Sequence, residues 1–187
     1  MTAWCETARL QRWRDQPCGE ALERARSVTQ PGVIGRLRVT LEQAIGEPAE
    51  ALCEATQDVL RETRELGMDG MAQMAWAVRA AGLLEHDPAA AADAARHVLA
   101  GLGRHDAPGL YRPWAWLSAA RALHAVGEPT AAASVLHDAL AWLDQRLRHG
   151  DVPAAFRDSF LHRNPVHREL FALAAHWGLA LAAERTD

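Results

Sequence analysis

The nine histidines of this 187-residue chain have the widest chemical repertoire, because imidazole serves as a metal ligand and as a general acid or base. All lie after residue 85: His86, His97, His105, His124, His137, His149, His162, His167 and His176. Two histidines on one helix bind a metal together when they are three or four residues apart, and no pair within a predicted helix has that spacing. His162 and His167 are five apart, separated by a helix break at Asn164-Pro165. We therefore expect exposed or structurally hydrogen-bonded histidines, no metal site and no cofactor, with a metal-dependent enzyme as an alternative.

Other residues that carry covalent or redox chemistry are few. All 20 basic residues are Arg, so a lysine Schiff base and a P-loop lysine are excluded. The chain has an odd number of cysteines without CxxC spacing: Cys5, Cys18 and Cys53. This pattern predicts neither a set of disulfides nor a thiolate zinc site, and it is typical of a protein in a reducing cytosol. The motifs GxGxxG, HExxH and GxSxG are absent. The sequence predicts a protein that is not an enzyme.

The charge balance argues against two further classes of partner. The formal net charge is −4 and the isoelectric point is near 6.1, so no global positive field attracts nucleic acid or anionic lipid. Charged side chains occur among the apolar residues at the N-terminus, so the apolar stretch of a signal peptide is absent there. No uncharged run approaches the roughly 18 residues of a membrane span. We expect a cytoplasmic protein that binds neither nucleic acid nor a membrane directly.

Four short motifs mark a repeat. An acidic or amide residue precedes proline at Gln16-Pro17, Glu47-Pro48, Asp87-Pro88 and Glu128-Pro129, at intervals of 31, 40 and 41 residues. An Ala-rich amphipathic run follows each pair. Because proline is tolerated in the first turn of a helix and pushes the preceding residue out of the helical region, each motif predicts a helix start.

A second helix is predicted upstream of each proline. Three of the four copies carry Trp and, four residues later, Ala: Trp4 and Ala8, Trp76 and Ala80, Trp116 and Ala120. Residues four apart share one helix face, so a bulky Trp and a small Ala offer a bump and a notch to a neighbouring helix. In the remaining copy Gly35 and Val39 take these positions, and that repeat is expected to be degenerate or to pack differently.

An all-α fold follows, as an array of antiparallel helical hairpins that forms one domain over residues 1–187. Ala and Leu far outnumber the β-branched residues, which argues against a mainly β fold. About ten helices are expected, at 2–14, 17–29, 32–45, 48–66, 69–85, 88–104, 111–126, 129–149, 153–162 and 165–184. They pair into hairpins at about 2–29, 32–66, 69–104 and 111–149, followed by a C-terminal cap at 153–184. Short connections favour antiparallel neighbours in sequence order.

The repeat around Trp116 resembles a tetratricopeptide repeat. The family's bulky, small and turn-glycine positions are matched by Trp116, Ala119, Ala120, Leu123, Gly127, Ala132, Leu136 and Ala139. Trp76, Ala80 and Leu83 repeat the first half of the pattern, whereas Asp87 replaces the turn glycine. The hairpins of about 40 residues also exceed the family's 34. The resemblance implies an α-solenoid with a concave binding surface along its first helices.

The segment 156–170, FRDSFLHRNPVHREL, is similar to a short sequence at the C-terminal end of tetratricopeptide arrays in large bacterial signalling ATPases and transcription activators. In those proteins the array follows a nucleotide-binding module. The resemblance implies that the chain is the terminal array of such a regulator, or a free-standing relative. Independently, Asn164 in an N-cap position and Pro165 predict a capping helix. Its packing stripe comprises Val166, Leu170, Leu173, Ala174, Trp177 and Leu181, and its polar face Arg168, Glu169, His176 and Glu184.

Aromatic and basic residues of the first helices are the candidate binding residues. If Trp116 faces the core, Trp114 lies about 200° around the helix from it and points nearly the opposite way. Residues on helix faces that do not pack against a neighbouring helix are available to a partner, and we predict that Arg12, Trp13, Trp114 and Arg121 bind it. Arg9 and Arg79 belong to the same predicted concave face.

The sequence thus favours a non-catalytic protein–protein interaction module in cytoplasmic signalling or transcriptional regulation, with a protein or peptide as partner. The alternative is a small-ligand sensor with an aromatic-lined pocket between hairpins. An extended groove favours the first function, and an enclosed apolar pocket the second. The oligomeric state is left open, because a first helix without a strongly polar outer face allows a homodimer.

Overall fold

The computed structural model describes residues 2–28, 32–104 and 109–179, and these residues contain helices and no strand. The α-helices are α1 (Thr2–Arg12), α2 (Gly19–Arg26), α3 (Val33–Ala44), α4 (Ala49–Glu65), α5 (Asp69–Gly82), α6 (Pro88–Gly101), α7 (Arg112–Ala125), α8 (Pro129–Arg148) and α9 (Pro165–His176). Two shorter turns, η1 (Ala154–Phe156) and η2 (Ser159–Arg163), connect α8 to α9. No helix in the described ranges combines the length and apolar character that crossing a bilayer requires.

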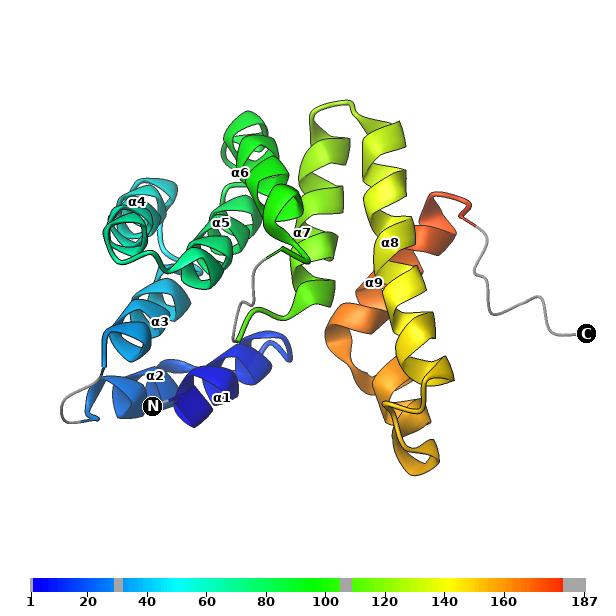
Figure 1. The fold of residues 1–187 in the computed structure, drawn as a ribbon, viewed down its shortest axis with the longest axis horizontal. Helices are drawn as coiled ribbons and strands as arrows, with labels where there is room; N and C mark the ends of the chain where they lie inside the picture. Colours follow the sequence, from blue (N-terminus) through cyan, green and yellow to red (C-terminus); the bar gives the residue numbers. More distant parts are fainter. Residues whose placement is uncertain (1, 29–31, 105–108, 180–187) are drawn as a thin grey trace, which may run out of the picture.

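The helices form the predicted array of antiparallel hairpins (Figure 1). Helices adjacent in sequence pack together, as α1 with α2, α3 with α4, α5 with α6, and α7 with α8. The first helices of the hairpins and α9 also contact one another in succession, so they form an inner layer. Figure 1 shows that the array bends into an arch with α4, α6 and α8 on its outer side. The all-α fold class is therefore confirmed.

Helix starts follow the proline motifs closely. Pro48 lies immediately before α4, and Pro88 and Pro129 are the first residues of α6 and α8. At α6 the side chain of Asp87 accepts a hydrogen bond from the backbone N–H of Ala90 at 3.0 Å. This bond satisfies one of the amide groups that a helix leaves without a partner in its first turn. The exception is α2, which begins at Gly19, two residues beyond Pro17.

The segment 153–162, expected to be an α-helix, is not one. It is helical from 154 to 163 but irregular: a 3₁₀ turn at Ala154–Phe156 is followed by two α-helical residues and a π-helical turn at Ser159–Arg163. Ser159 accepts a hydrogen bond from the backbone N–H of Asn164 at 3.1 Å, which is the wider spacing of a π-turn. The turn is held in place because the Phe160 carbonyl bonds to the buried imidazole of His167.

The cap begins as predicted and is shorter than predicted. The Asn164 side chain accepts hydrogen bonds from the backbone N–H groups of Val166 at 3.0 Å and His167 at 3.3 Å, as an N-cap residue does. The helix α9 ends at His176. Leu181 and Glu184, which were assigned to the same helix, lie outside the described residues.

The Trp and Ala of the repeat play different parts in packing. Ala8, Ala80 and Ala120 are fully buried between helices. The tryptophans, predicted in the core, are instead half-buried at the edges of the helix interfaces. Trp4 carries the Arg24 guanidinium over its ring, Trp76 stacks on His97, and Trp116 packs against Trp142. Helices that approach closely at alanine leave no room for an indole, which therefore covers the seam from outside.

We expect Ala120→Leu and Ala132→Leu each to lower the free energy of unfolding by about 1–3 kcal/mol, because both alanines are fully buried between α7 and α8 and a larger side chain overpacks the hairpin. Urea denaturation of the two variants measures this. Ala131→Leu, on the exposed face of α8, is the matched control and should stay within about 0.5 kcal/mol of wild type. Wild-type stability in both core variants would show that the hairpin alignment is wrong.

Candidate functional site

A hollow of about 420 Å³ lies where three of the inner helices end beside α7. We call it the inner hollow. Its lining comes from the end of α1, the turn after α3, the end of α5 and the turn after it, and one face of α7. These residues are Arg9, Arg12, Trp13, Ile45, Gly46, Glu47, Ala81, Gly82, Leu84, Glu85, His86, Trp114 and Arg121. The hollow is neither sealed from solvent nor flat.

The structure brings all four predicted binding residues to this hollow. Arg12 and Trp13 approach it from α1, and Trp114 and Arg121 from α7. These two helices are distant in sequence, and the arch places them together. Arg79, which was also assigned to the concave face, does not line the hollow, because its guanidinium turns outward to Gln57 on α4 at 3.4 Å.

A second hollow, of about 570 Å³, lies between the end of α1 and the C-terminal cap. We call it the cap hollow. It is lined by Trp13, Asp15, Leu161, His162, Pro165, Arg168, Glu169, Phe171 and Ala172. Trp13 belongs to both hollows, and the ion pair between Arg121 and Glu169, at 2.9 Å, links a wall of one to a wall of the other. The two hollows therefore adjoin at the Trp13 side chain, and we call the pair of them the groove.

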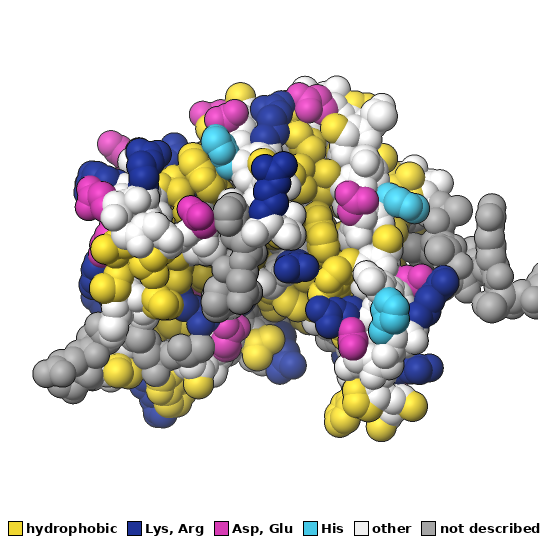
Figure 2. All heavy atoms as spheres, viewed as in Figure 1, with side chains coloured by type: hydrophobic (Ala, Val, Ile, Leu, Met, Phe, Trp, Pro, Cys, Tyr) yellow, Lys and Arg dark blue, Asp and Glu magenta, His cyan; other side chains and the backbone are white. Residues whose placement is uncertain are grey.

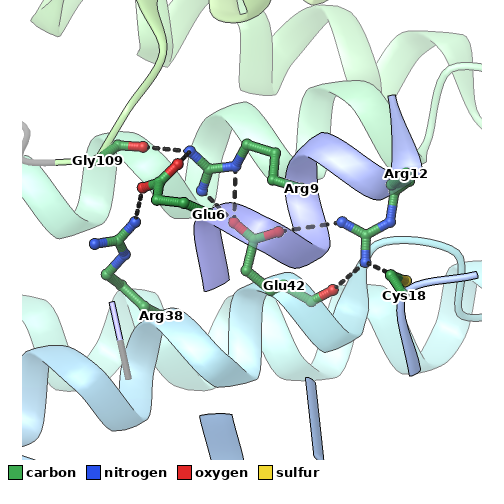
Figure 3. A network of polar contacts seen from close by, with 7 residues as sticks. All are labelled: Glu6, Arg9, Arg12, Cys18, Arg38, Glu42 and Gly109. Atoms are coloured by element: carbon green, nitrogen blue, oxygen red, sulfur yellow. Dashed lines mark hydrogen bonds and ion pairs between the residues drawn. The ribbon is translucent and has the colours of Figure 1, made fainter. Parts of the chain in front are cut away.

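Beneath the inner hollow lies a buried ionic cluster, the floor network, made by Glu6, Arg9, Arg12, Arg38 and Glu42 (Figure 3). Glu42, on α3, is fully buried. It accepts from Arg9 Nε at 2.9 Å, from Arg9 Nη2, and from Arg12 Nη1 at 3.1 Å. Arg12 also donates to the Glu42 carbonyl at 2.7 Å. One carboxylate thus fixes both guanidiniums of α1 and anchors that helix to α3.

The same network closes the arch against the start of α7. Arg9 Nη1 donates to the carbonyl of Gly109, three residues before α7. Arg38, paired with Glu6, lies against the Gly109 backbone so closely that a Cβ there would come within 2.6 Å of Arg38 Nη2. Gly109 also has a φ of 86°, in the region that favours glycine. The Arg9 hydrogen bond and the Arg38 contact thus tie α1 and α3 to the segment that leads into α7.

Trp13 is held in place by a chain of polar and aromatic contacts that reaches α9. Its ring packs against Tyr111 with centroids 5.3 Å apart. Asn164 Nδ2 donates to the Tyr111 hydroxyl at 2.9 Å, and that hydroxyl is hydrogen-bonded to Nε2 of His167. His167 Nδ1 is bonded to the Phe160 carbonyl. Since a carbonyl only accepts, Nδ1 carries the proton and Nε2 accepts from Tyr111.

Burial controls the ionisation of this chain. Desolvation raises the pKa of Tyr111 to about 12, so its hydroxyl stays a hydrogen-bond donor. His167 is fully buried, and its desolvation lowers the pKa of the imidazole, which the Phe160 carbonyl offsets only in part. The folded state therefore holds His167 neutral. It belongs to the structural histidines that the sequence predicts.

We expect stability to fall as the pH falls below about 6.5, the ordinary pKa of histidine. Above that value His167 is neutral in both states; below it only the unfolded chain binds the proton, until the lower folded pKa is reached. Linkage limits the loss to about 1.4 kcal/mol per pH unit for this one group. Urea denaturation between pH 5 and 7.5 measures the slope. It should flatten in His167→Phe and persist in His137→Gln, at an exposed position of α8; equal slopes in both variants would refute the assignment.

Trp114 is less exposed than its position off the packing stripe suggests. It is half-buried and packs against the cores formed by α3, α5 and α7 while also lining the inner hollow. Trp116 packs on the other side of the helix, against Trp142 of α8. The predicted opposition of the two rings is therefore found, with Trp114 forming a fixed wall of the hollow.

The histidines do not gather into a metal site in the described part of the chain, where no group of three His, Cys, Asp or Glu side chains is placed to hold an ion. His97 stacks on Trp76, and His124 on Trp177, with ring centroids 4.2 Å and 4.7 Å apart. His105 lies outside the described residues.

Charges of both signs are interspersed on the face that Figure 2 shows. The basic residues near the C-terminus form exposed ion pairs: Arg146 with Asp151, Arg148 with Asp144, and Arg163 with Asp158. Pairs of this kind contribute little to stability.

Comparison with protein-family models, with curated proteins and with solved structures finds no match to this chain.

Proposed function

We propose that this protein is a non-catalytic interaction module that binds an extended segment of a partner protein in the groove formed by the inner and cap hollows. The observation that carries the proposal is that the two hollows share Trp13 and are linked by the Arg121–Glu169 pair. Two adjoining hollows that open to solvent suit a peptide chain better than a small molecule, which needs most of its surface enclosed.

The groove has the chemistry of a recognition site. Trp and Arg are enriched among the residues that contribute most of the binding energy at interfaces. Here Trp13, Trp114 and Arg121 line the same hollow. Trp13 and Trp114 are also fixed by packing before any partner arrives. Rigid walls reduce the entropy lost on binding, so more of the contact energy remains as affinity.

The cellular setting belongs to the same proposal. The resemblance to tetratricopeptide repeats and to the C-terminal arrays of bacterial regulators supports a place in cytoplasmic signalling or transcriptional regulation. With a net charge of −4 and paired surface arginines, the partner is a protein or peptide in preference to nucleic acid or a membrane.

A library of random twelve-residue peptides displayed on phage tests the proposal. Selection on the wild-type chain, followed by depletion on Trp114→Ala, should enrich linear peptides that bind only when the Trp114 wall is present. Trp116→Ala removes an equally half-buried indole from the same helix without touching the groove, and it should retain those peptides. A selection that leaves no peptide after depletion on Trp114→Ala, or peptides that lose binding to Trp116→Ala to the same extent, would rule the groove out.

A further inference from the structure

We propose that the inner hollow receives a cationic side chain of the partner segment, specifically an arginine, between its tryptophan walls and the rim carboxylates Glu47 and Glu85. This inference rests on the proposed function and specifies the chemistry of its partner. Three independent features of the hollow carry it: its charge balance, the helix ends that meet there, and the aromatic rings.

The cations of the hollow are already neutralised by the chain itself, whereas its carboxylates are not. Arg9 and Arg12 are bound by Glu42, and Arg121 by Glu169. Glu47 and Glu85 line the same hollow, and no ion pair joins either to another described residue. The floor network holds three guanidiniums and two carboxylates, and the Arg121–Glu169 pair is neutral. Adding the two rim carboxylates gives the whole site one excess negative charge, which favours a cationic guest.

Three helices end at the hollow with their carbonyl ends. The last residues of α1, α3 and α5 are Arg12, Ala44 and Gly82, and the hollow is lined by residues at or directly after these positions. Each helix C-terminus acts as roughly half a negative charge and favours cations within its last turn. The chain already uses this preference, since the Arg12 guanidinium donates to the Glu42 carbonyl near the end of α3.

The aromatic walls favour arginine over other cations. Trp13 and Trp114 both line the hollow, and indole is the side chain that attracts cations most strongly through its ring face. A guanidinium is planar, stacks on aromatic faces and still presents several N–H donors in its plane. Its donors can then reach a carboxylate at the rim while its flat face covers an indole. The apolar stem of the arginine would lie against Leu84 and Ile45.

A capped pentapeptide, Leu-Ala-Arg-Ala-Leu, tests the inference by tryptophan fluorescence titration against two relatives. Citrulline in place of arginine keeps the shape and removes the charge; glutamate reverses it. We expect the arginine peptide to bind at least tenfold more tightly than either. The double variant Glu47→Gln/Glu85→Gln should weaken the arginine peptide at least fivefold and leave the citrulline peptide unchanged. Glu54→Gln, at an exposed position of α4, is the control and should change neither.

Equal affinity for the arginine and citrulline peptides, tighter binding of the glutamate peptide, or no detectable binding of the arginine peptide would each overturn the inference. The peptides selected from the phage library separate this failure from failure of the groove itself. Selected peptides that depend on Trp114 but lack a basic residue would leave the groove as a binding site and remove its preference for arginine. A library that yields no Trp114-dependent peptide would remove both.

Discussion

Replacing Glu42 by Gln lowers the free energy of unfolding by about 3–5 kcal/mol, because the variant leaves Arg12 without a counter-charge and the buried Arg9 with only the more distant Glu6, at 3.6 Å. Glutamine keeps the size of the side chain, so the loss reports charge rather than a cavity. The effect is large because breaking one side of a buried ion pair costs more than the pair contributes. Chemical denaturation followed by far-UV circular dichroism measures it.

Two comparisons make the Glu42 result specific. Glu54→Gln removes an exposed carboxylate from α4 and should change stability by less than about 0.5 kcal/mol. The double variant Arg9→Met/Glu42→Met removes the buried Arg9–Glu42 pair as a whole and should be clearly more stable than Glu42→Gln. A Glu42→Gln protein as stable as the Glu54→Gln control would mean that the floor network does not hold α1 against α3.

Truncation of Trp114 or Arg121 is expected to weaken binding of a groove-selected peptide by about 2 kcal/mol or more, which corresponds to roughly thirtyfold in Kd. Trp114→Ala removes a fixed aromatic wall. Arg121→Ala removes the side chain that spans the two hollows and holds Glu169, so a peptide lying across both loses contact area that the gain in negative charge does not replace. Isothermal titration calorimetry with the selected peptide measures both. Arg61→Ala, which breaks an exposed ion pair with Asp58 on α4, should bind like the wild type.

Because Trp114 also packs against the core, its truncation needs a control for stability. Trp116→Ala loses an indole of similar burial on the opposite side of α7 and should keep wild-type affinity. Trp114→Phe retains an aromatic ring at the wall and should fall between the wild type and Trp114→Ala. If Trp114→Ala, Arg121→Ala and Arg61→Ala, all folded, bind the peptide equally, this face is not the binding surface.

The positions of the helices were predictable because residues close together in the sequence determine where each helix starts. Proline and its preceding acidic residue fix helix starts through backbone sterics, and Asn164 fixes α9 through its side-chain bonds to two amides. The π-turn in the connecting segment 153–162 was not predictable, because it depends on a hydrogen bond between the Phe160 carbonyl and the side chain of His167 in the following helix. Half-burial of the tryptophans also depends on how closely two helices approach, which no single helix encodes.

The groove was predictable only in part. Helical periodicity placed Trp114 and Arg121 away from the packing stripe, and the arch then brought them to Arg12 and Trp13. Glu42 was missed. Glu42 follows Arg38 by four residues on one helix, a spacing that is typical of an exposed ion pair within the helix. Its actual partners, Arg9 and Arg12, lie on α1. Tyr111 is the single tyrosine of the chain, and this rarity was the one weak sign in the sequence of a special role. Its hydrogen-bond partners at the start of α9 could not be predicted, because tertiary structure brings them together.

If partner segments occupy the groove beside Trp13 and Trp114, the indole N–H resonances of the seven tryptophans should report where the segment lies. A peptide from the phage selection is titrated into the isotope-labelled protein, with each resonance assigned by a Trp→Phe variant. We predict shifts at Trp13 and Trp114 that saturate with the calorimetric Kd, and unchanged resonances for Trp4 and Trp142 on the outer edges of the array. If only the Trp4 or Trp142 resonance shifts, and those of Trp13 and Trp114 do not, the peptide binds outside the groove.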